Sequence, residues 1–322
     1  MTGVWALVVT RNRKQLLTEC LQALLGQTHP VAGIIVFDNG STDGTVDWLR
    51  ARGLMGSPRL RFERSEVNGG GAGGFAQALR LGCATEAEWL WLMDDDAEPD
   101  PDALERLLSS SVATDPTTVA LCTRVVHRDR STDPLHRCRL RQFITPLPAG
   151  AYAPGTHVDV DCASFVGLLL RGDGARAAGL PRAEFFLGYD DAEYCLRLRA
   201  LGRIRLVPES VVTHKLVVGG GQRTWRCALW NRVLGTDYTS SPWEDYWKDL
   251  YRVRNLVVLR VAHGGLSTSR LTILILGYVV KTLLYEERPL RRIPWLVRFA
   301  LKGRRQDFRA PSPKQWLIYT GS

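Results

Sequence analysis

The sequence of 322 residues predicts an α/β fold, a mostly parallel β-sheet with helices on both faces, followed by a C-terminal helical region. Two observations lead to this prediction. Short apolar runs alternate with segments of helical periodicity through the first half of the chain, as in sheets whose parallel strands are joined by helices. Beyond about residue 225 the composition shifts toward Trp, Arg and Leu, so we expect two regions, residues 1–222 and 223–322.

The expected strands are short apolar runs bounded by polar residues or glycine. They lie at residues 5–9, 34–37, 60–62, 89–93 and 119–126. Apolar residues at helical spacing mark residues 16–25 and 76–83 between them. Residues 128–154, rich in Pro, Arg and His, predict a loop over one edge of the sheet, and order is expected again at residues 158–170. The last helix of this region is expected to begin at Asp190 and to end at Gly202.

The composition excludes several classes of protein. Seven cysteines, an odd number without a CxxC pair, argue against a zinc ribbon and a disulfide framework. A formal net charge of +9 favours acidic partners such as phosphates or an anionic membrane surface, and no nucleic-acid-binding module is recognisable. No signal peptide is visible. The nearest approach to a membrane span, residues 271–284, contains Lys281 and is short, so we expect no spanning segment.

An acidic triplet stands where a sheet of this kind binds its ligands, beyond the carboxyl end of a strand. Asp94, Asp95 and Asp96 directly follow the apolar run 89–93. Side chains alternate along a strand, so Asp94 and Asp96 are expected to point to one side and Asp95 to the other. Two carboxylates on one side form a hard-oxygen site for Mg²⁺ or Mn²⁺. The alternative is a solvated turn that caps the next helix.

Two further groups of residues are candidates for chemistry. His214 ends a strand-like run, and a neutral imidazole beside two carboxylates suits Mn²⁺ better than Mg²⁺. Asp190, Asp191 and Glu193 stand at a helix start, where carboxylates also stabilise the helix by their charge alone. A carboxylate there acts as a general base if it reaches a substrate hydroxyl.

The glycine-rich run at residues 68–74, NGGGAGG, contains the GxGxxG spacing of dinucleotide-binding turns. Two strand–helix units precede this run, whereas the dinucleotide fingerprint belongs to the first turn, so an NAD-dependent oxidoreductase is a remote alternative. In either interpretation the glycines let the backbone approach a ligand closely. The helix that follows offers free N–H groups to a diphosphate.

Four elements, in this order, resemble the inverting family 2 glycosyltransferases with a GT-A fold. They are residues 8–13 (VVTRNR), 38–43 (DNGSTD), 93–99 (MDDDAEP) and 190–193 (DDAE) with His214. Residues 68–75 are similar to the N-x-G-G-x-G-G-F stretch of the bacterial galactofuranosyltransferase and rhamnosyltransferase branch. The resemblance covers about residues 3–218.

The resemblance implies a metal site and a donor site in the first half of the region, about residues 1–125. Asp94 and Asp96 correspond to the family's DxD motif and His214 to its C-terminal metal histidine, which implies Mn²⁺ or Mg²⁺ as cofactor. Further residues correspond to positions that border the nucleotide, the diphosphate or the sugar. These nucleotide-sugar-binding residues are Thr10, Arg11, Asn12, Asp38, Asn68, Gly69, Gly70 and Asp95.

The second half, about residues 126–222, is implied to receive the acceptor. Asp191 corresponds to the catalytic base, and Asp190 and Glu193 would orient or contact the acceptor. Many family members have Glu-Asp where this chain has Asp-Asp, which leaves the choice between Asp190 and Asp191 open. One base and no nucleophile predict a single displacement with inversion at the sugar carbon.

The implied function is transfer of a sugar from a nucleotide diphosphate donor to a cell-envelope glycan or lipid-linked acceptor. Galactofuranosyl transfer from UDP-galactofuranose is preferred to rhamnosyl transfer from dTDP-rhamnose. A non-catalytic sugar-nucleotide-binding protein is a third interpretation, and the complete set of acidic and histidine positions argues against it.

The C-terminal region favours a place on the membrane. Residues 285–309 hold eight Arg or Lys against three acidic residues, beside Trp and Leu. We expect this region to contact the inner face of the cell membrane from the cytoplasm. The alternative is a helical subdomain that packs on the catalytic domain or on a second copy in a homodimer.

Overall fold

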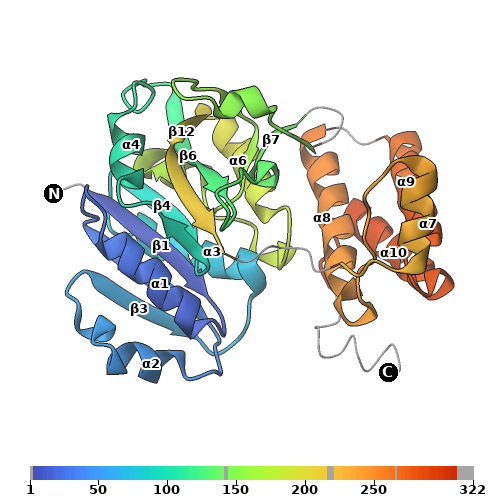
Figure 1. The fold of residues 1–322 in the computed structure, drawn as a ribbon, viewed down its shortest axis with the longest axis horizontal. Coiled ribbons are helices and arrows are strands. Elements are labelled where there is room, and N and C mark those ends of the chain that lie inside the picture. Colours follow the sequence, from blue (N-terminus) through green and yellow to red (C-terminus); the bar gives the residue numbers. More distant parts are fainter. Residues whose placement is uncertain (1–2, 141–143, 216–220, 265–266, 310–322) are drawn as a thin grey trace. The chain divides into compact units, whose positions relative to one another are not determined.

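The computed structural model describes residues 3–140, 144–215, 221–264 and 267–309 (Figure 1). By its internal contacts the chain divides into two compact units. The first unit consists of Met1–Phe186 and Asp190–Val217, and we call it the α/β unit. The second consists of Leu187–Tyr189 and Val218–Ser322, is helical, and is called the C-terminal unit.

A mixed sheet forms the centre of the α/β unit. Its strands follow the order β3-β2-β1-β4-β11-β6-β12-β5, and β9 pairs with β12. The first four strands are parallel, and β12 is parallel to β6, whereas β11 is antiparallel to both β4 and β6. The bounds are β1 (Val4–Thr10), β2 (Gly33–Asn39), β3 (Leu60–Ser65), β4 (Trp89–Asp94), β5 (Ala97–Pro99), β6 (Thr118–Val126), β9 (Asp159–Val160), β11 (Leu168–Arg171) and β12 (Arg203–His214).

The predicted α/β class is confirmed, although the sheet is mixed and not mostly parallel. Parallel neighbours need a crossover connection, usually a helix. The segment between β6 and β11 contains short strands and 3₁₀ turns but no α-helix among its described residues, and β11 runs antiparallel to β6. Two helices, α5 and α6, lie between β11 and β12, and β12 runs parallel to β6.

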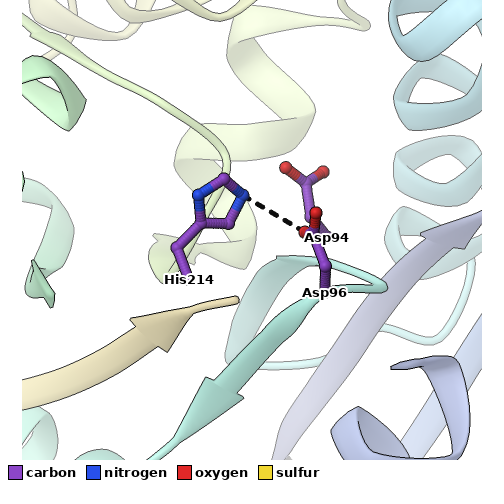
Figure 2. A group of neighbouring side chains, drawn as sticks. All are labelled: Asp94, Asp96 and His214. Carbon is purple, nitrogen blue, oxygen red and sulfur yellow. Dashed lines mark ion pairs between the residues drawn. The ribbon is translucent and has the colours of Figure 1, made fainter. Parts of the chain in front are cut away.

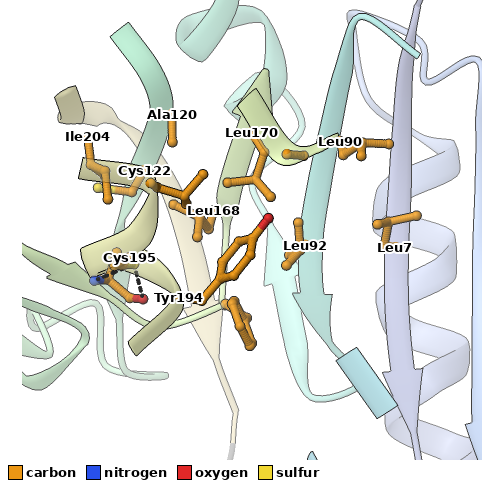
Figure 3. Close-up of a cluster of buried hydrophobic side chains, with 14 of the residues drawn as sticks. Leu7, Leu90, Leu92, Ala120, Cys122, Leu168, Leu170, Tyr194, Cys195 and Ile204 are labelled. Atoms are coloured by element: carbon orange, nitrogen blue, oxygen red, sulfur yellow. Dashed lines mark hydrogen bonds between the residues drawn. The ribbon is translucent and has the colours of Figure 1, made fainter. Parts of the chain in front are cut away.

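Helices cover both faces of the sheet, and strand alternation sorts the core between them. One face packs against α1 (Lys14–Leu25), α2 (Thr45–Ala51) and α4 (Ala103–Ser109). The other packs against α3 (Gly70–Cys83), α5 (Gly172–Ala178) and α6 (Asp190–Arg199), and Figure 3 shows part of this core. In β1, Ala6 and Val8 belong to the first core and Leu7 and Val9 to the second, as period-two alternation requires.

A second, three-stranded sheet corrects the prediction of a loop at residues 128–154. It contains β7 (Arg137–Leu140), β8 (Ile144–Pro146) and β10 (Cys162–Ala163), with 3₁₀ turns at Pro134–His136 and Ala149–Tyr152. The loop prediction was partly wrong. Arg137, which a surface loop would leave solvated, is buried. Its guanidinium donates hydrogen bonds to the backbone oxygens of Thr123 at 2.8 Å and Val166 at 2.6 Å, which fixes β7 to the main sheet.

Four α-helices build the described part of the C-terminal unit. They are α7 (Trp225–Leu234), α8 (Tyr246–Gly264), α9 (Thr268–Tyr285) and α10 (Pro289–Arg304). Val253 and Val257 of α8 pack with Leu271 of α9 and Ala300 of α10. Gly303 permits close packing of α10 on α8, because a Cβ there would lie 2.4 Å from the backbone oxygen of Arg254.

One helix of this unit has membrane-like composition. Among the described residues, α9 alone is long and apolar enough to cross a membrane, judged by length and composition. Only 17% of this stretch is buried within the structure. The helix extends beyond residues 271–284 at both ends and includes Arg270 and Lys281, and the expectation that no segment spans a membrane stays a prediction.

Candidate active site

The sheet brings the polar ends of several strands to one edge. Thr10 is in register with Asp38 across β1 and β2, and Val9 is in register with Asp94 across β1 and β4. After Asp94 the chain turns into β5, which runs antiparallel to the end of β12. His214 is thereby paired with Ala97, the residue that follows Asp96. The topology therefore explains how a histidine distant in sequence reaches the acidic triplet.

The acidic triplet points in two directions. Ligand atoms of Asp94, Asp96 and His214 all lie within 4.8 Å of one another, and Figure 2 shows the three side chains facing one another. Asp96 Oδ1 lies 3.2 Å from His214 Nε2. Asp95 instead faces β1, where its Oδ2 accepts hydrogen bonds from Thr10 Oγ1 at 2.8 Å and from the backbone N–H of residue 11 at 3.2 Å. The three predicted metal ligands thus lie together, and Asp95 serves the first strand.

The electrostatics of this cluster match a site built for positive charge. Burial, with the nearby charge of Asp96, raises the pKa of Asp94 to about 7. Burial also opposes ionisation of Asp96, but the close His214 ring and the charge of Arg13 outweigh it, so the pKa of Asp96 lies below its ordinary value. The same pairing with Asp96 raises the pKa of His214 in spite of burial.

The cluster fits a divalent cation because of its ligand types and because one buried carboxylate oxygen has no hydrogen bond from the described residues. Asp96 Oδ1 is buried and accepts no hydrogen bond from the residues that the structure describes, although it faces His214. A buried carboxylate oxygen without a hydrogen bond is costly unless a cation binds it. Two carboxylates and an imidazole suit Mn²⁺, and the carboxylates also suit Mg²⁺. Asp94, Asp96 and His214 are therefore the residues that would hold the metal.

Arg13 is part of the site, although the sequence analysis did not assign it a role. Its Nη1 lies 3.0 Å from Asp95 Oδ1 and 2.9 Å from Asp96 Oδ2. One guanidinium therefore links Asp95, which faces β1, to Asp96, which faces His214. The Arg13 side chain is 43% exposed, whereas both carboxylates are buried. The signal was available, since Arg13 closes the VVTRNR motif and stands just beyond the first strand.

The loop after β2 is fixed to the loop after β1. Asp38 is buried, its Oδ1 accepts the N–H of Ser41 at 2.9 Å, and its Oδ2 lies 3.6 Å from Arg64 Nε. Asn12 has a φ of +54°, and its Oδ1 accepts the N–H of Thr42 at 2.7 Å. The predicted nucleotide-binding residues Asn12 and Asp38 thus also hold their own loops in place.

A neighbouring residue, Asn39, organises the glycine-rich run and was not predicted. Its Oδ1 accepts the N–H of Gly69 at 2.9 Å, and its Nδ2 donates to the backbone oxygen of Gly70 at 2.7 Å. Asn68 Oδ1 accepts the N–H of Gly70 at 2.9 Å. The side chains of Asn39 and Asn68 therefore bind the first N–H groups of the run, and α3 begins directly after them.

Glycine is needed at only some positions of this run, and the reason differs between them. Gly70 has a φ of +71°, and a Cβ there would lie 2.1 Å from the backbone oxygen of Phe186. A Cβ on Gly74 would lie 2.5 Å from Val9 Cγ1. By contrast, a Cβ on Gly71 or Gly73 would meet no atom within 4 Å among the described residues. Gly70 and Gly74 are needed for packing, and Gly71 and Gly73 are the ones that face open space.

Asp191 stands in the first turn of α6, partly exposed at the surface. Its Oδ1 accepts the N–H of Ala192 at 2.7 Å. Burial raises the pKa of Asp191 to about 6, although that hydrogen bond and the charge of Arg137 act in the opposite direction. Such a carboxylate is ionised at neutral pH yet more basic than an ordinary aspartate, which suits a general base.

The two other acidic residues of this turn have different surroundings. Asp190 is buried at the first position of α6. Glu193 is buried and paired with Arg197, whose Nη2 lies 2.9 Å from Glu193 Oε2. Arg197 also donates to the backbone oxygens of Ala178 and Leu180, so this ion pair ties α6 to the segment after α5. The structure places Glu193 against Arg197, and its predicted contact with an acceptor stays a prediction.

A second layer of polar residues lies behind His214. The ring of His136 meets the ring of His214 edge to face, with centroids 5.0 Å apart. His136 Nε2 lies 3.3 Å from Asp133 Oδ2, and its Nδ1 lies 2.7 Å from Ser164 Oγ. Asp133 and His136 lie in residues 128–154, the segment predicted to be a loop, so periodicity gave no signal for them.

The comparisons with known proteins place this fold and site in a family. The family model described as glycosyl transferase family 2 matches residues 5–169, more than half of the chain. The chain therefore belongs to glycosyl transferase family 2, and the family prediction made from the motifs is confirmed.

Two curated relatives narrow the branch. Galactofuranosyltransferase GlfT1 of Mycolicibacterium smegmatis is 30% identical over 199 residues, which cover 61% of this chain and 65% of that protein. The protein of the same name from Mycobacterium tuberculosis is 32% identical over 203 residues, which cover 61% and 64%. The chain is thus similar to the galactofuranosyltransferase branch, and it matches slightly less than two thirds of the length of these relatives.

Solved structures support the fold. GalNAc-T7 with UDP, GalNAc and Mn²⁺ has a TM-score of 0.57 at 13% identity, covering 81% of this chain and 48% of that one. A mannosyltransferase from Pyrobaculum calidifontis in complex with GDP-Man and Mn²⁺ has a TM-score of 0.51 at 20% identity, covering 94% and 86%. At these identities the likeness concerns the fold alone, and it confirms the predicted GT-A type.

Proposed function

We propose that this protein is an inverting, metal-dependent glycosyltransferase that moves a sugar from a nucleotide diphosphate to an acceptor hydroxyl. The observation that carries the proposal is the cluster of Asp94, Asp96 and His214 at the strand ends where β1 and β2 also finish. Bound there, Mn²⁺ or Mg²⁺ would bind the donor diphosphate and offset the negative charge that develops on it.

The chain's own residues supply the rest of the donor site. Thr10 and the backbone of residue 11 are fixed by Asp95, which shapes the strand end against which the nucleotide is proposed to lie. Arg13 adds positive charge at the same edge. Gly71 and Gly73 leave space beside the N-terminus of α3, where the helix dipole favours a phosphate. The N–H groups of Gly70, Ala72 and Gly73 are already bonded to oxygens of the protein, so the dipole and the open space support this part of the proposal.

Asp191 is proposed as the base. It accepts the proton of the acceptor hydroxyl while the hydroxyl oxygen bonds to the anomeric carbon of the donor sugar. The bond from that carbon to the diphosphate oxygen breaks, and its electron pair leaves with the nucleoside diphosphate. A single displacement of this kind inverts the configuration of the anomeric carbon. Asp190 is the alternative base, and Glu193 is proposed to act on the acceptor side.

For the donor we propose UDP-galactofuranose, and dTDP-rhamnose is the alternative. The support is the similarity to the two galactofuranosyltransferases, together with the asparagine and glycine run at residues 68–75. Membership of glycosyl transferase family 2 leaves the NAD-dependent oxidoreductase without support. A cell-envelope glycan or a lipid-linked intermediate is the proposed acceptor.

The C-terminal unit is proposed to hold the enzyme on the cytoplasmic face of an anionic membrane. Residues 221–322 contain 18 Lys or Arg against 7 Asp or Glu, a net charge of +11, whereas residues 1–220 contain 24 against 26, a net charge of −2. Ile273, Leu276 and Val280 lie on one face of α9 and are 69%, 56% and 52% exposed. Basic charge beside an exposed apolar face suits a bilayer with anionic lipids.

A vesicle flotation assay on the full chain tests the membrane proposal. The wild type is expected to float with vesicles that contain phosphatidylglycerol at low salt, and less at high salt. Leu276→Glu combined with Val280→Glu is expected to abolish flotation. Leu201→Glu is the matched control, because Leu201 is 50% exposed on the α/β unit. Flotation of the α9 double variant at the wild-type level would contradict the proposal and favour a second copy of the chain as the cover of α9.

The proposed reaction is tested by nucleotide release from a panel of sugar nucleotides with Mn²⁺, Mg²⁺ or EDTA and a crude lipid acceptor extract. The panel holds UDP-galactofuranose, UDP-galactopyranose, UDP-glucose, UDP-N-acetylglucosamine, GDP-mannose and dTDP-rhamnose. We expect metal-dependent release of UDP from UDP-galactofuranose alone. Release of dTDP from dTDP-rhamnose alone would make rhamnose the transferred sugar. Nucleotide release that is unchanged by EDTA would contradict metal dependence.

A further inference from the structure

The four residues before α6 have an unusual backbone. Phe186 has φ and ψ of 62° and −55°, Gly188 has a φ of 82°, and Tyr189 has a φ of 63°. Positive φ is costly for residues with a Cβ, so this segment, residues 186–189, stores strain at Phe186 and Tyr189. We call it the strap. Its last residue is followed directly by Asp190 and Asp191.

Hydrogen bonds to both units hold the backbone of the strap. The N–H of Ala72, in the first turn of α3, donates to the backbone oxygen of Phe186 at 3.2 Å. Asn255 of α8 donates through Nδ2 to the backbone oxygens of Leu187 at 3.0 Å and Gly188 at 2.9 Å. The first bond belongs to the α/β unit, and the other two lie within the C-terminal unit, to which residues 187–189 belong by their contacts.

Asn255 is built into α8 in a way that fixes its amide. The residue is fully buried, and its Oδ1 accepts a hydrogen bond from Nε of Arg254 at 2.9 Å. Because Oδ1 faces a guanidinium donor, Nδ2 must face the two strap carbonyls. Gly188 contributes from the other side, since a Cβ there would lie 3.0 Å from Cγ of Arg252. The strap therefore depends on a donor at residue 255 and on the absence of a side chain at residue 188.

We infer that Asn255 is a positioning residue for the transfer reaction: its amide holds the strap that sets the first turn of α6 and, with it, Asp191. The inference rests on the proposed function of Asp191 as base. Strain of this kind persists only where surrounding contacts over-determine the backbone; α3 bonds Phe186 within the α/β unit, and α8 bonds residues 187 and 188 within the C-terminal unit. The C-terminal unit thus takes part in catalysis through the chain itself, in addition to any role at a membrane.

The central variant is Asn255→Leu in the full chain, which keeps the number and branching of the side-chain heavy atoms and removes the donor. A misplacement of about 1 Å in a reacting group can cost ~100-fold in rate, so we expect kcat to fall by about 10- to 100-fold. The affinity for UDP with Mn²⁺ is expected to stay at the wild-type value. Backbone amide exchange at residues 186–191 is expected to become faster, which reports the strap directly and needs no turnover.

Matched controls separate positioning from general destabilisation. Asn231→Leu removes a comparable amide in α7, where Nδ2 donates to the backbone oxygen of Tyr238 at 2.8 Å. Gly188→Ala strains the strap and crowds the Arg252 side chain while it keeps the amide donor of Asn255. Gly235→Ala changes another glycine of positive φ, at a position where a Cβ meets no described atom within 4 Å. We expect Gly188→Ala to reproduce the effect of Asn255→Leu, also if Asn255→Leu fails to fold. Asn231→Leu and Gly235→Ala are expected to keep kcat and the exchange pattern.

Two results would overturn the inference. One is a kcat and an exchange pattern for Asn255→Leu and Gly188→Ala that equal those of the wild type. The other is equal loss of kcat in Asn255→Leu and Asn231→Leu, since that points to general destabilisation. Failure of the proposed function has a different signature: full transfer by Asp191→Asn, or no turnover by the wild type with any donor. Faster exchange in the strap of Asn255→Leu would even then show that Asn255 holds it.

Discussion

Replacing Asp191 with Asn is expected to stop transfer and, at the same time, to stabilise the fold. Burial raises the pKa of Asp191 to about 6, about two units above the value near 3.9 in an unfolded chain. The folded protein holds this proton more tightly than the unfolded chain does. Ionisation of Asp191 therefore costs stability progressively as the pH rises from about 4 to about 6, and the full cost persists above. Two units correspond to at most ~3 kcal/mol at pH 7.5, which solvent screening of the partly exposed side chain reduces, and to about half of that at pH 5.

An amide at this position is neutral at every pH and keeps an oxygen for the N–H of Ala192. Thermal unfolding of the full chain should thus show a Tm for Asp191→Asn that is about 2–10 °C above the wild type at pH 7.5, with a smaller difference at pH 5. Transfer should fall by about 10²- to 10⁴-fold, with UDP affinity unchanged. A Tm at or below the wild-type value at pH 7.5 would refute the hypothesis that burial of the Asp191 carboxylate raises its pKa and costs stability. Transfer that survives in Asp191→Asn and disappears in Asp190→Asn would identify Asp190, and not Asp191, as the catalytic base.

Three further predictions concern the donor site and the pH dependence. Gly70→Ala should lower the free energy of unfolding by more than ~2 kcal/mol, because its Cβ would meet the carbonyl of Phe186 at positive φ. Gly71→Ala, whose Cβ would meet no described atom within 4 Å, should raise it by about 0.5–1 kcal/mol. Urea unfolding checks this pair, and equal effects would contradict the division of the glycines. Arg13→Met should tighten Mn²⁺ binding and weaken UDP binding, each by about fivefold, because it removes a cation 2.9 Å from Asp96. Calorimetry of each ligand checks whether the two affinities change in opposite directions. A change in the same direction would be evidence against Arg13 as a positive charge of the donor site. Finally, kcat/KM should fall about tenfold per pH unit below about 6, because protonated Asp191 cannot accept a proton; a profile that is flat from pH 5 to pH 8 would remove Asp191 as the base.

The sequence contained most of the information on the strand ends. The apolar runs at β1, β2, β4 and β6 are continuous because these strands are covered on both faces, and such runs are readable from composition alone. The triplet at residues 94–96 was equally readable, because alternation along β4 separates Asp95 from its neighbours. The proximity of His214 was implied by the family motif and is explained by the pairing of β5 with β12.

The parts that sequence reasoning missed depend on long-range contacts. The segment at residues 128–154 has no periodic pattern, because its order comes from buried Arg137 and its carbonyl partners in β6 and before β11. Asn39 and Asn255 are ordinary polar residues in sequence, and only the tertiary structure shows which backbone groups they bind. Gly70 was taken for a ligand-contacting glycine, and the structure shows that the carbonyl of Phe186 occupies the space of its Cβ.

The most direct test of the account is a calorimetric titration of UDP into the full chain, with Mn²⁺ and with EDTA. With Mn²⁺, UDP is expected to bind at one site. No measurable binding of UDP is expected in EDTA, and none is expected with Mn²⁺ for the double variant Asp94→Asn, Asp96→Asn. Binding of UDP that is equally strong with EDTA, or that survives in this double variant, would contradict a donor site built on Asp94, Asp96 and His214.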